Sequence, residues 1–287
     1  MNRTLPLLTP ELAYRLEASS IFFSVEKQKA LGSLPGNPHG IQTRTFGNAT
    51  AFLALKTHNS EMLNHIGNIT GDDVPYLNAI LDWYARHDVC CSFDIVPSNA
   101  SPTLLWHLAS KGFYQSSFYN MFYGLPYVAQ KPLPGVVVRP VLPEEKDMFA
   151  EVYFDSFEVP KTETYAYVRH SIRSLVEIPT NRCLFALVHN TIAAIAVVSI
   201  SQEVGYLALS ATLPHFRGYG CQKTLLQERI HLASQAGCDL VTCQVGVGTI
   251  SQQNVEKIGL HLAYTKATWS TFNKHQKPNE EIDPTNR

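Results

Sequence analysis

The sequence shows no excess of charge of either sign. Its 287 residues include 23 Lys and Arg against 24 Asp and Glu, a formal net charge of −1, and the basic residues do not cluster. Binding to a polyanion such as DNA relies on clustered positive charge. The sequence also lacks any apolar run near the roughly 20 residues that a membrane-spanning helix needs. We therefore expect neither a nucleic-acid partner nor a membrane partner.

Metal-binding patterns are absent as well. None of the six cysteines belongs to a C-x-x-C pair, and the eleven histidines show no H-E-x-x-H spacing, so the sequence predicts no metal site. We expect the cysteines to be free, buried thiols. Cys221 is the exception, because the pattern places it at a helix N-terminus, where a thiolate is stabilised.

A secretory leader is not expected either. The first residues of the chain have some apolar character, but Pro6, Pro10, Glu11 and Glu17 interrupt it. A signal peptide needs a continuous apolar region of about 7–15 residues. We therefore expect a cytoplasmic protein.

The most informative stretch is Leu207–Gly237. Its first seven residues form an apolar run that predicts a strand. Arg217-Gly-Tyr-Gly-Cys-Gln222 follows, and then apolar residues recur with the spacing of one helix face. Gly237 is well placed to end that helix. The stretch therefore predicts a strand, a glycine-containing turn and a helix.

Such a turn is able to bind a phosphate group. The first amides of a helix have no partner within the helix, and the helix dipole adds partial positive charge there. Gly218 and Gly220 let the backbone approach a ligand closely, and Arg217 adds a forked cationic donor. The nucleotide-hydrolase pattern G-x-x-x-x-G-K-[ST] and the dinucleotide pattern G-x-G-x-x-G are both absent. A tight turn that merely starts a helix is the alternative.

The segments after this helix help to decide between a phosphate-binding turn and a turn that merely starts a helix. A strand is predicted at Asp239–Val245, a short helix at Ser251–Ile258 and a last strand at Leu262–Phe272. This order resembles the GNAT superfamily of acyl-CoA-dependent N-acetyltransferases. The family's pyrophosphate loop, [RQ]-x-x-G-x-[GA], stands here as Arg217-x-x-Gly220-x-Gln222, with Gln222 in place of a small residue. Its second signature, E-K-x-G-[FL], stands as Glu256-Lys-Ile-Gly-Leu260, and the resemblance covers about half of the chain, from near Val136 to Phe272.

The first half of the chain shows the same plan of strand, short helix, glycine and aromatic strand. Gly112-Phe113 stands where the second half has Gly259-Leu260. Ile66–Asp73, however, carries acids where a pyrophosphate would need donors, so this half reads as a degenerate copy. An unrelated α+β domain is the alternative.

The resemblance implies an α/β (α+β) fold of two GNAT-like domains, each a mixed, mostly antiparallel sheet flanked by helices. We expect the degenerate N-terminal domain at residues 1–130, the acetyltransferase domain at 136–275 and a polar tail at 276–287.

The resemblance also implies how acetyl-CoA would bind as a co-substrate. The backbone of Ala211, Thr212 and Leu213 would pair with the pantetheine arm, and one amide there would face the thioester oxygen. Asn254 is a further candidate contact. The backbone amides that would hold the pyrophosphate belong to Arg217, Gly218, Tyr219, Gly220, Cys221 and Gln222. An ordinary core strand is the alternative for the first three residues.

The acid that protonates the leaving thiolate is where the sequence departs from the family. Many members carry Tyr at the position of Val255, which has no proton to donate. Ser251 and Tyr264 are the candidate donors, and Glu203 is a candidate to relay a proton from the amine. A packing role for Tyr264 and a solvated turn for Glu203 are the alternatives.

The implied function is direct transfer of an acetyl group from acetyl-CoA to the amine of a small molecule, by a monomer or a homodimer. Two alternatives remain. One is an acyl-CoA-binding sensor without turnover, and the other is a protein or peptide N-acetyltransferase.

Overall fold

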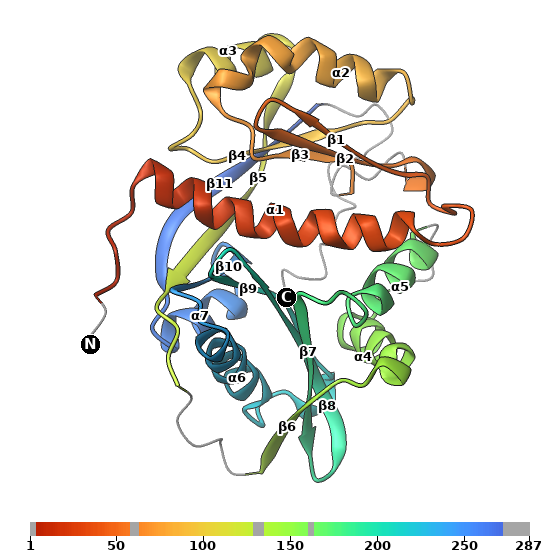
Figure 1. Cartoon of the computed structure of the whole chain (residues 1–287), viewed down its shortest axis with the longest axis vertical. Helices are drawn as coiled ribbons and strands as arrows, with labels where there is room; N and C mark the ends of the chain where they lie inside the picture. Colours follow the sequence, from red (N-terminus) through yellow and green to blue (C-terminus); the bar gives the residue numbers. More distant parts are fainter. Residues whose placement is uncertain (1–3, 58–62, 129–134, 160–163, 272–287) are drawn as a thin grey trace. The chain divides into compact units, whose positions relative to one another are not determined.

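The computed structural model describes residues 4–57, 63–128, 135–159 and 164–271. The chain divides into two compact units (Figure 1). Among the described residues, unit 1 holds residues 4–7 and Met121–Leu262, and unit 2 holds Leu8–Asn120 and residues 263–271.

Unit 2 begins with one long helix, α1 (Pro10–Gly32). The Thr9 side chain caps it by accepting the Leu12 N–H, and Pro10 occupies a first-turn position, where its missing N–H costs nothing. The sheet of this unit has the order β1-β2-β3-β4-β11-β5, with β3 and β4 parallel. Its elements are β1 (Ile41–Phe46), β2 (Ala49–Ala54), β3 (His65–Gly67), α2 (Leu77–Ala85), β4 (Ser92–Ile95), α3 (Pro102–Ser110) and parts of β5 and β11.

The apolar core of unit 2 joins this sheet to α2 and α3. Ile80, Tyr84 and Leu104 from the helices pack with Phe93 of β4 and Trp269 of β11. Burial of this apolar face is the main stabilising term for such a layered unit.

Unit 1 has the strand order β5-β10-β9-β8-β7-β6, and of the pairs from β10 to β6 only β10–β9 is parallel. The predicted mixed, mostly antiparallel sheet is therefore confirmed. Its elements are β6 (Val136–Pro140), α4 (Lys146–Phe157), α5 (Tyr165–Ser174), β7 (Asn181–Val188), β8 (Thr191–Ser201), β9 (Val204–Thr212), α6 (Cys221–Gln235), β10 (Leu240–Gly246) and α7 (Ile250–Lys257). Helix α6 packs so closely on β9 that a Cβ on Gly205 would lie 2.6 Å from the Ala233 Cβ.

Two strands pass from one unit into the other. β5 (Phe113–Gly124) starts in unit 2 and ends in unit 1, whereas β11 (His261–Thr271) starts in unit 1 and ends in unit 2. Within unit 2 the Ser116 hydroxyl donates to the Thr268 carbonyl, and within unit 1 the Thr242 hydroxyl donates to the Phe122 carbonyl. Each unit therefore contains strand residues from both halves of the sequence.

Strand β3 ends at Gly67, because Asn68 adopts φ +58°, which a continuing strand cannot accommodate. The polar tail expected at 276–287 lies outside the described residues.

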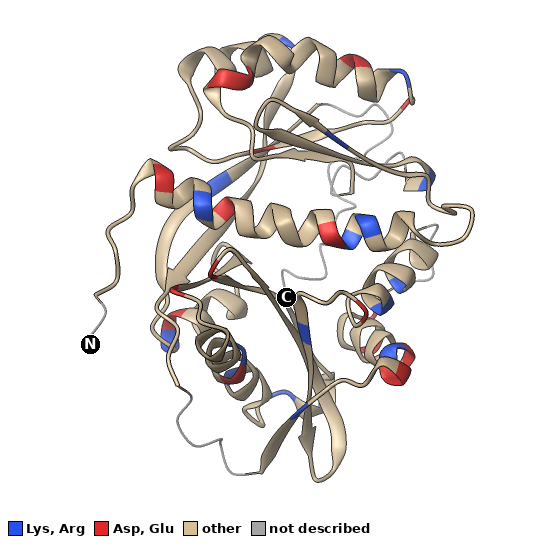
Figure 2. Cartoon of the chain, viewed as in Figure 1, with Lys and Arg blue, Asp and Glu red and all other residues tan. Residues whose placement is uncertain are grey.

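None of the helices in the described ranges combines the length and the apolar character that crossing a bilayer would need. Figure 2 shows Lys and Arg scattered over several elements rather than gathered along one helix.

Candidate functional site

Strands β9 and β10 pair only at their beginnings. The register joins Leu240 to Val204 and ends with Thr242 opposite Tyr206. β9 then continues to Thr212 and β10 continues to Gly246 without further pairing to each other. The ladder therefore opens along the second half of β9, which is an arrangement that an extended ligand enters by pairing with the free strand edge.

The ladder between β8 and β9 decides which amides of β9 face this opening. The Leu213 N–H donates to the Ala193 carbonyl at 2.9 Å, which makes these two residues a hydrogen-bonded pair. Such pairs alternate along an antiparallel ladder. Ser210 and Thr212 therefore belong to non-hydrogen-bonded pairs with β8. Their N–H groups point away from β8, toward the opening between β9 and β10.

This alternation separates the strand residues predicted to bind the cofactor by the direction of their backbone amides. The amide of Thr212 faces the opening, whereas those of Ala211 and Leu213 face β8. Ser210 was missed at the level of sequence. The period of two along a strand would have paired it with Thr212 once the neighbouring strand was known.

The predicted phosphate loop follows β9 directly. Gly218 and Gly220 have φ of +88° and +85°, values that favour glycine, and a Cβ on Gly218 would meet only open space. Gly220 is the N-cap of α6 and supplies no capping side chain. The first amides of α6 therefore stand at a glycine turn with the orientation that binds an anion.

Two side chains tie this loop to its surroundings in unit 1. The Gln222 Nε2 donates to the Thr212 hydroxyl at 2.9 Å, so the residue that departs from the family pattern joins the start of α6 to the end of β9. The Arg217 guanidinium donates to the Ser156 carbonyl at 3.1 Å and so joins the loop to α4. Tyr219 is exposed beside them.

Cys221 is the first residue of α6, the helix N-terminal position that the sequence pattern predicted. Its side chain is buried in an apolar cluster, and burial raises the pKa of the thiol despite its place at the helix N-terminus. The desolvation of the charged form outweighs the local amides.

The other candidates lie in different places. Ser251 is exposed and Asn254 half-buried, one helical turn apart on α7, which packs on β10 and α6. Glu203 lies in the turn before β9, about 30 Å along the strand from Thr212 at the usual rise per residue. Tyr264 is buried in unit 2, where its hydroxyl donates to Glu17 Oε2 at 3.0 Å.

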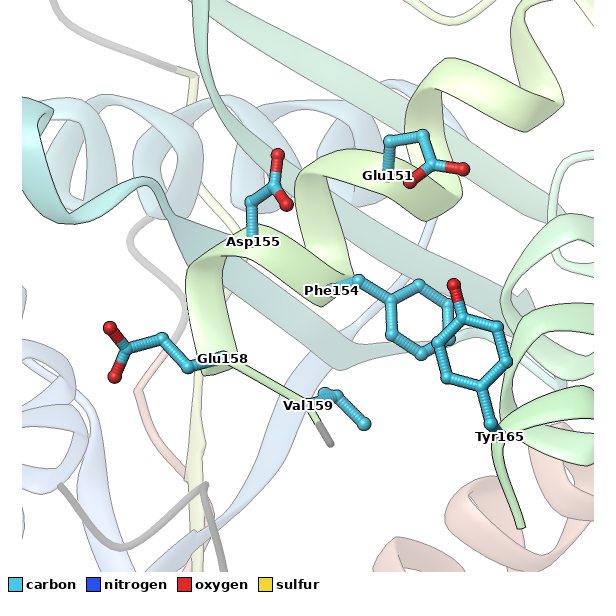
Figure 3. Close-up of a pocket in the computed structure, with 6 residues that line it drawn as sticks. All are labelled: Glu151, Phe154, Asp155, Glu158, Val159 and Tyr165. Atoms are coloured by element: carbon cyan, nitrogen blue, oxygen red, sulfur yellow. The ribbon is translucent and has the colours of Figure 1, made fainter. Parts of the chain in front are cut away.

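A pocket of about 430 Å³ opens between the end of α4 and the start of α5 (Figure 3). Rings of Phe154 and Tyr165 pack with centroids 4.5 Å apart on one side of it. Glu151, Asp155 and Glu158 also line it, and Arg169 pairs with Glu151. The remaining lining residue is Val159.

Ser156, whose carbonyl accepts the hydrogen bond from Arg217 of the phosphate loop, follows the pocket residue Asp155 on α4. The sequence analysis missed the pocket. Acidic side chains in the last turns of a helix interact unfavourably with the helix dipole. Their presence at the end of α4 was the feature of the sequence that could have indicated this pocket. Within the described ranges no three His, Cys, Asp or Glu side chains are grouped to hold a metal ion.

Comparisons with known proteins agree with this geometry. Residues 146–261 match the model of the acetyltransferase (GNAT) family. The chain is similar to the structure of a GCN5-related N-acetyltransferase from Kribbella flavida, with a TM-score of 0.60 and 17% identity, covering 88% of this chain and 97% of that one. A GCN5-related N-acetyltransferase from Sphaerobacter thermophilus gives 0.53 and 16%, covering 93% and 96%.

The similarity extends to a tandem GNAT protein from the clavulanic acid biosynthesis pathway, with a TM-score of 0.55 and 15% identity, covering 85% of this chain and 87% of that one. No curated protein matches the chain. At these identities the structural likenesses establish the fold.

Proposed function

Residues 146–261 carry a GNAT acetyltransferase domain, and from this premise we propose that the protein transfers an acetyl group from acetyl-CoA to the amine of a small molecule. The observation that carries the proposal is the opening of the β9–β10 ladder directly before a glycine turn and an uncapped helix N-terminus. A strand edge and a phosphate-binding turn in sequence suit a ligand with an extended amide-bearing arm and a pyrophosphate.

In this proposal the amides from Arg217 to Gln222 hold the pyrophosphate, and the amides of Ser210 and Thr212 face the acyl-pantetheine arm. The substrate nitrogen attacks the thioester carbon, the C–S bond breaks, and the nitrogen loses a proton while the sulfur gains one. Negative charge grows on the thioester oxygen during attack, so a fixed N–H donor there lowers the barrier. Holding both reactants in place supplies much of the remaining rate.

Ser251 is the proposed hydrogen-bond donor to the leaving sulfur, and Asn254 a proposed contact to the cofactor. Both belong to α7, the helix that carries Val255 in the position of the family's acid. Glu203 is left out because of its distance along β9, and Tyr264 because Glu17 already engages its hydroxyl.

The α4–α5 pocket supports a cationic acceptor. Asp155 and Glu158 would attract an ammonium group, and the Phe154–Tyr165 pair offers aromatic surface to an alkyl or cationic portion. Arg217 links this pocket to the loop, so both substrates would lie within one unit.

The test is release of free coenzyme A from acetyl-CoA with a panel of cationic amines, neutral amino sugars and acidic amino acids, followed by mass measurement of the product. Turnover is expected with cationic amines, and Asp155→Asn is expected to raise their KM with little effect on kcat. Acetyl-CoA binding without turnover on any amine would favour the sensor alternative, for which the valine at 255 is the supporting observation. Acetylated peptides would favour transfer to proteins instead.

A further inference from the structure

One charged side chain lies inside the core of unit 1. Arg229 is 2% exposed, on the face of α6 that also carries Leu226, Ile230 and Ala233. Among the described residues no carboxylate forms an ion pair with it, and burial and Cys243 are the influences on its pKa. Burying a cation without a counter-ion costs free energy of desolvation. Apolar packing alone therefore does not explain the position of Arg229.

The guanidinium is satisfied by backbone carbonyls instead of carboxylates. Its Nε donates to the Leu225 carbonyl at 3.3 Å within α6. Its Nη1 donates to Val197 of β8 at 3.3 Å and to Leu209 of β9 at 3.1 Å. Burial lowers the pKa of Arg229 to about 10, so the group still carries its charge at neutral pH. The cation therefore joins α6 to the two strands that precede the phosphate loop.

These contacts fall where β9 departs from regular pairing. Val197 lies opposite Leu209, and Ser199 lies opposite Tyr206, so two steps on β8 correspond to three on β9. β9 thus contains a bulge at this point, and its pairing with β10 ends at Tyr206. A bulge disrupts the ladder and bends the strand locally. Arg229 donates a hydrogen bond to the Leu209 carbonyl immediately after this bulge.

The Leu209 carbonyl and the Ser210 amide belong to the same peptide group. That group is planar and trans, so its C=O and N–H point in opposite directions. Holding the carbonyl on the β8 side therefore aims the N–H toward the opening between β9 and β10. A cation on the carbonyl also polarises the peptide and strengthens its N–H as a donor.

We propose that Arg229 is a positioning residue for acyl transfer, which aims and polarises the Leu209–Ser210 peptide so that the Ser210 N–H binds the developing charge on the thioester oxygen. This role rests on the acetyl transfer proposed above, and Arg229 itself touches neither substrate.

The test compares Arg229→Met, which keeps the length without donors, with Arg229→Lys, which keeps a cation. Removing an oxyanion donor outright costs about 100- to 1,000-fold in kcat. Because the Ser210 amide remains in Arg229→Met, we expect a smaller loss, about 10-fold or more. The Kd of coenzyme A, which has no acyl oxygen, should stay within about threefold. Arg229→Lys should recover part of kcat.

Ile230→Ala is the matched control, since it removes buried volume from the same face of α6 and removes no hydrogen bond to a β9 carbonyl. It should lower the melting temperature while kcat stays near that of the unchanged protein. Equal kcat for Arg229→Met and Ile230→Ala, or a parallel loss of coenzyme A binding in Arg229→Met, overturns the proposal. If Arg229→Met fails to fold, the Arg229→Lys variant carries the same comparison.

Amide hydrogen exchange of residues 206–213 separates this proposal from the function on which it rests. Exchange there should speed up in Arg229→Met or Arg229→Lys while α6 stays protected, and should not change in Ile230→Ala. A protein that turns over no amine refutes the acetyl transfer even if this exchange result holds. Unchanged exchange in both arginine variants refutes the role of Arg229 even if turnover is found.

Discussion

The Nζ of Lys266 lies 2.9 Å from the Oε1 of Glu17, and both side chains are almost fully buried within unit 2. The same ammonium group lies 3.1 Å from Asp94 Oδ2. Although burial opposes its ionisation, Lys266, His65 and Thr268 together hold the pKa of Asp94 below its usual value. One cation from β11 therefore neutralises carboxylates from α1 and β4.

Replacement of Lys266 by Met should destabilise the protein strongly. It leaves the Glu17 carboxylate buried without its cation, and breaking a buried pair in this way costs about 3–5 kcal/mol. Urea denaturation measures the loss. The double variant Glu17→Gln with Lys266→Met should regain part of the stability, because the uncompensated charge is gone. A single variant that loses less than about 1 kcal/mol would contradict this account.

Gly220→Val should weaken acetyl-CoA binding about tenfold or more, because a β-branched residue at φ +85° costs of order 1–3 kcal/mol and displaces the start of α6. Calorimetry gives the affinity. Gly237→Val is the matched control, since Gly237 also has a positive φ of +78° but follows the far end of α6. Equal affinities in the two variants would remove the loop from the binding site.

The protein should bind one acetyl-CoA per chain. In unit 2 we interpret Ile66–Asp73 as the counterpart of the loop, and the carboxylate of Asp73 occupies backbone donors there. Asp73 is 1% exposed and accepts the backbone N–H groups of Asn48 and Thr70 at 2.8 Å each. These two backbone N–H groups, which could otherwise bind a phosphate, already donate to Asp73. A titration that reaches two equivalents with similar affinity would refute this prediction.

Ser251→Ala should lower kcat by roughly 100-fold if its hydroxyl assists the leaving thiolate, with little change in acetyl-CoA affinity. Tyr264→Phe should behave in the opposite way. It removes a buried hydrogen bond to Glu17, so we expect about 1–3 kcal/mol less stability and an unchanged kcat. Steady-state kinetics and thermal unfolding of both variants check this, and near-normal turnover by Ser251→Ala would exclude the serine.

Acid stability should depend on Glu145. The bidentate hydrogen bonds from Arg139, at 2.7 Å each, and the Leu142 N–H lower the pKa of Glu145 from 4.5 to about 2. A depressed folded-state pKa contributes stability above about pH 4.5 that is lost as the pH falls toward 2. Since the pair is partly exposed, we expect about 1 kcal/mol at most.

Unfolding curves between pH 6 and pH 2 test this contribution. Glu145→Gln should unfold with a shallower dependence on pH than the unchanged protein across that window. Identical slopes for the two proteins would show that the pair contributes nothing to acid stability.

Local pattern was enough to predict much of unit 1. The strand before the loop, the positive-φ glycines and the helices α6 and α7 follow from side-chain periodicity and from residues within a few positions of one another. The family resemblance rested on the same short-range motifs, and the match of residues 146–261 agrees with it. The order of elements could therefore be predicted before any long-range contact was known.

The sequence by itself determined the glycine turn at Gly218 and Gly220, because their conformation depends on the absence of a Cβ and not on distant partners. Only the tertiary structure decided the hydrogen-bond partners of Tyr264 and Arg229. The hydroxyl of Tyr264 meets Glu17 across 247 positions of the chain, and Arg229 meets Val197 across 32. Burial and hydrogen-bond direction arise when strands from distant segments pair, and no local pattern encodes that pairing.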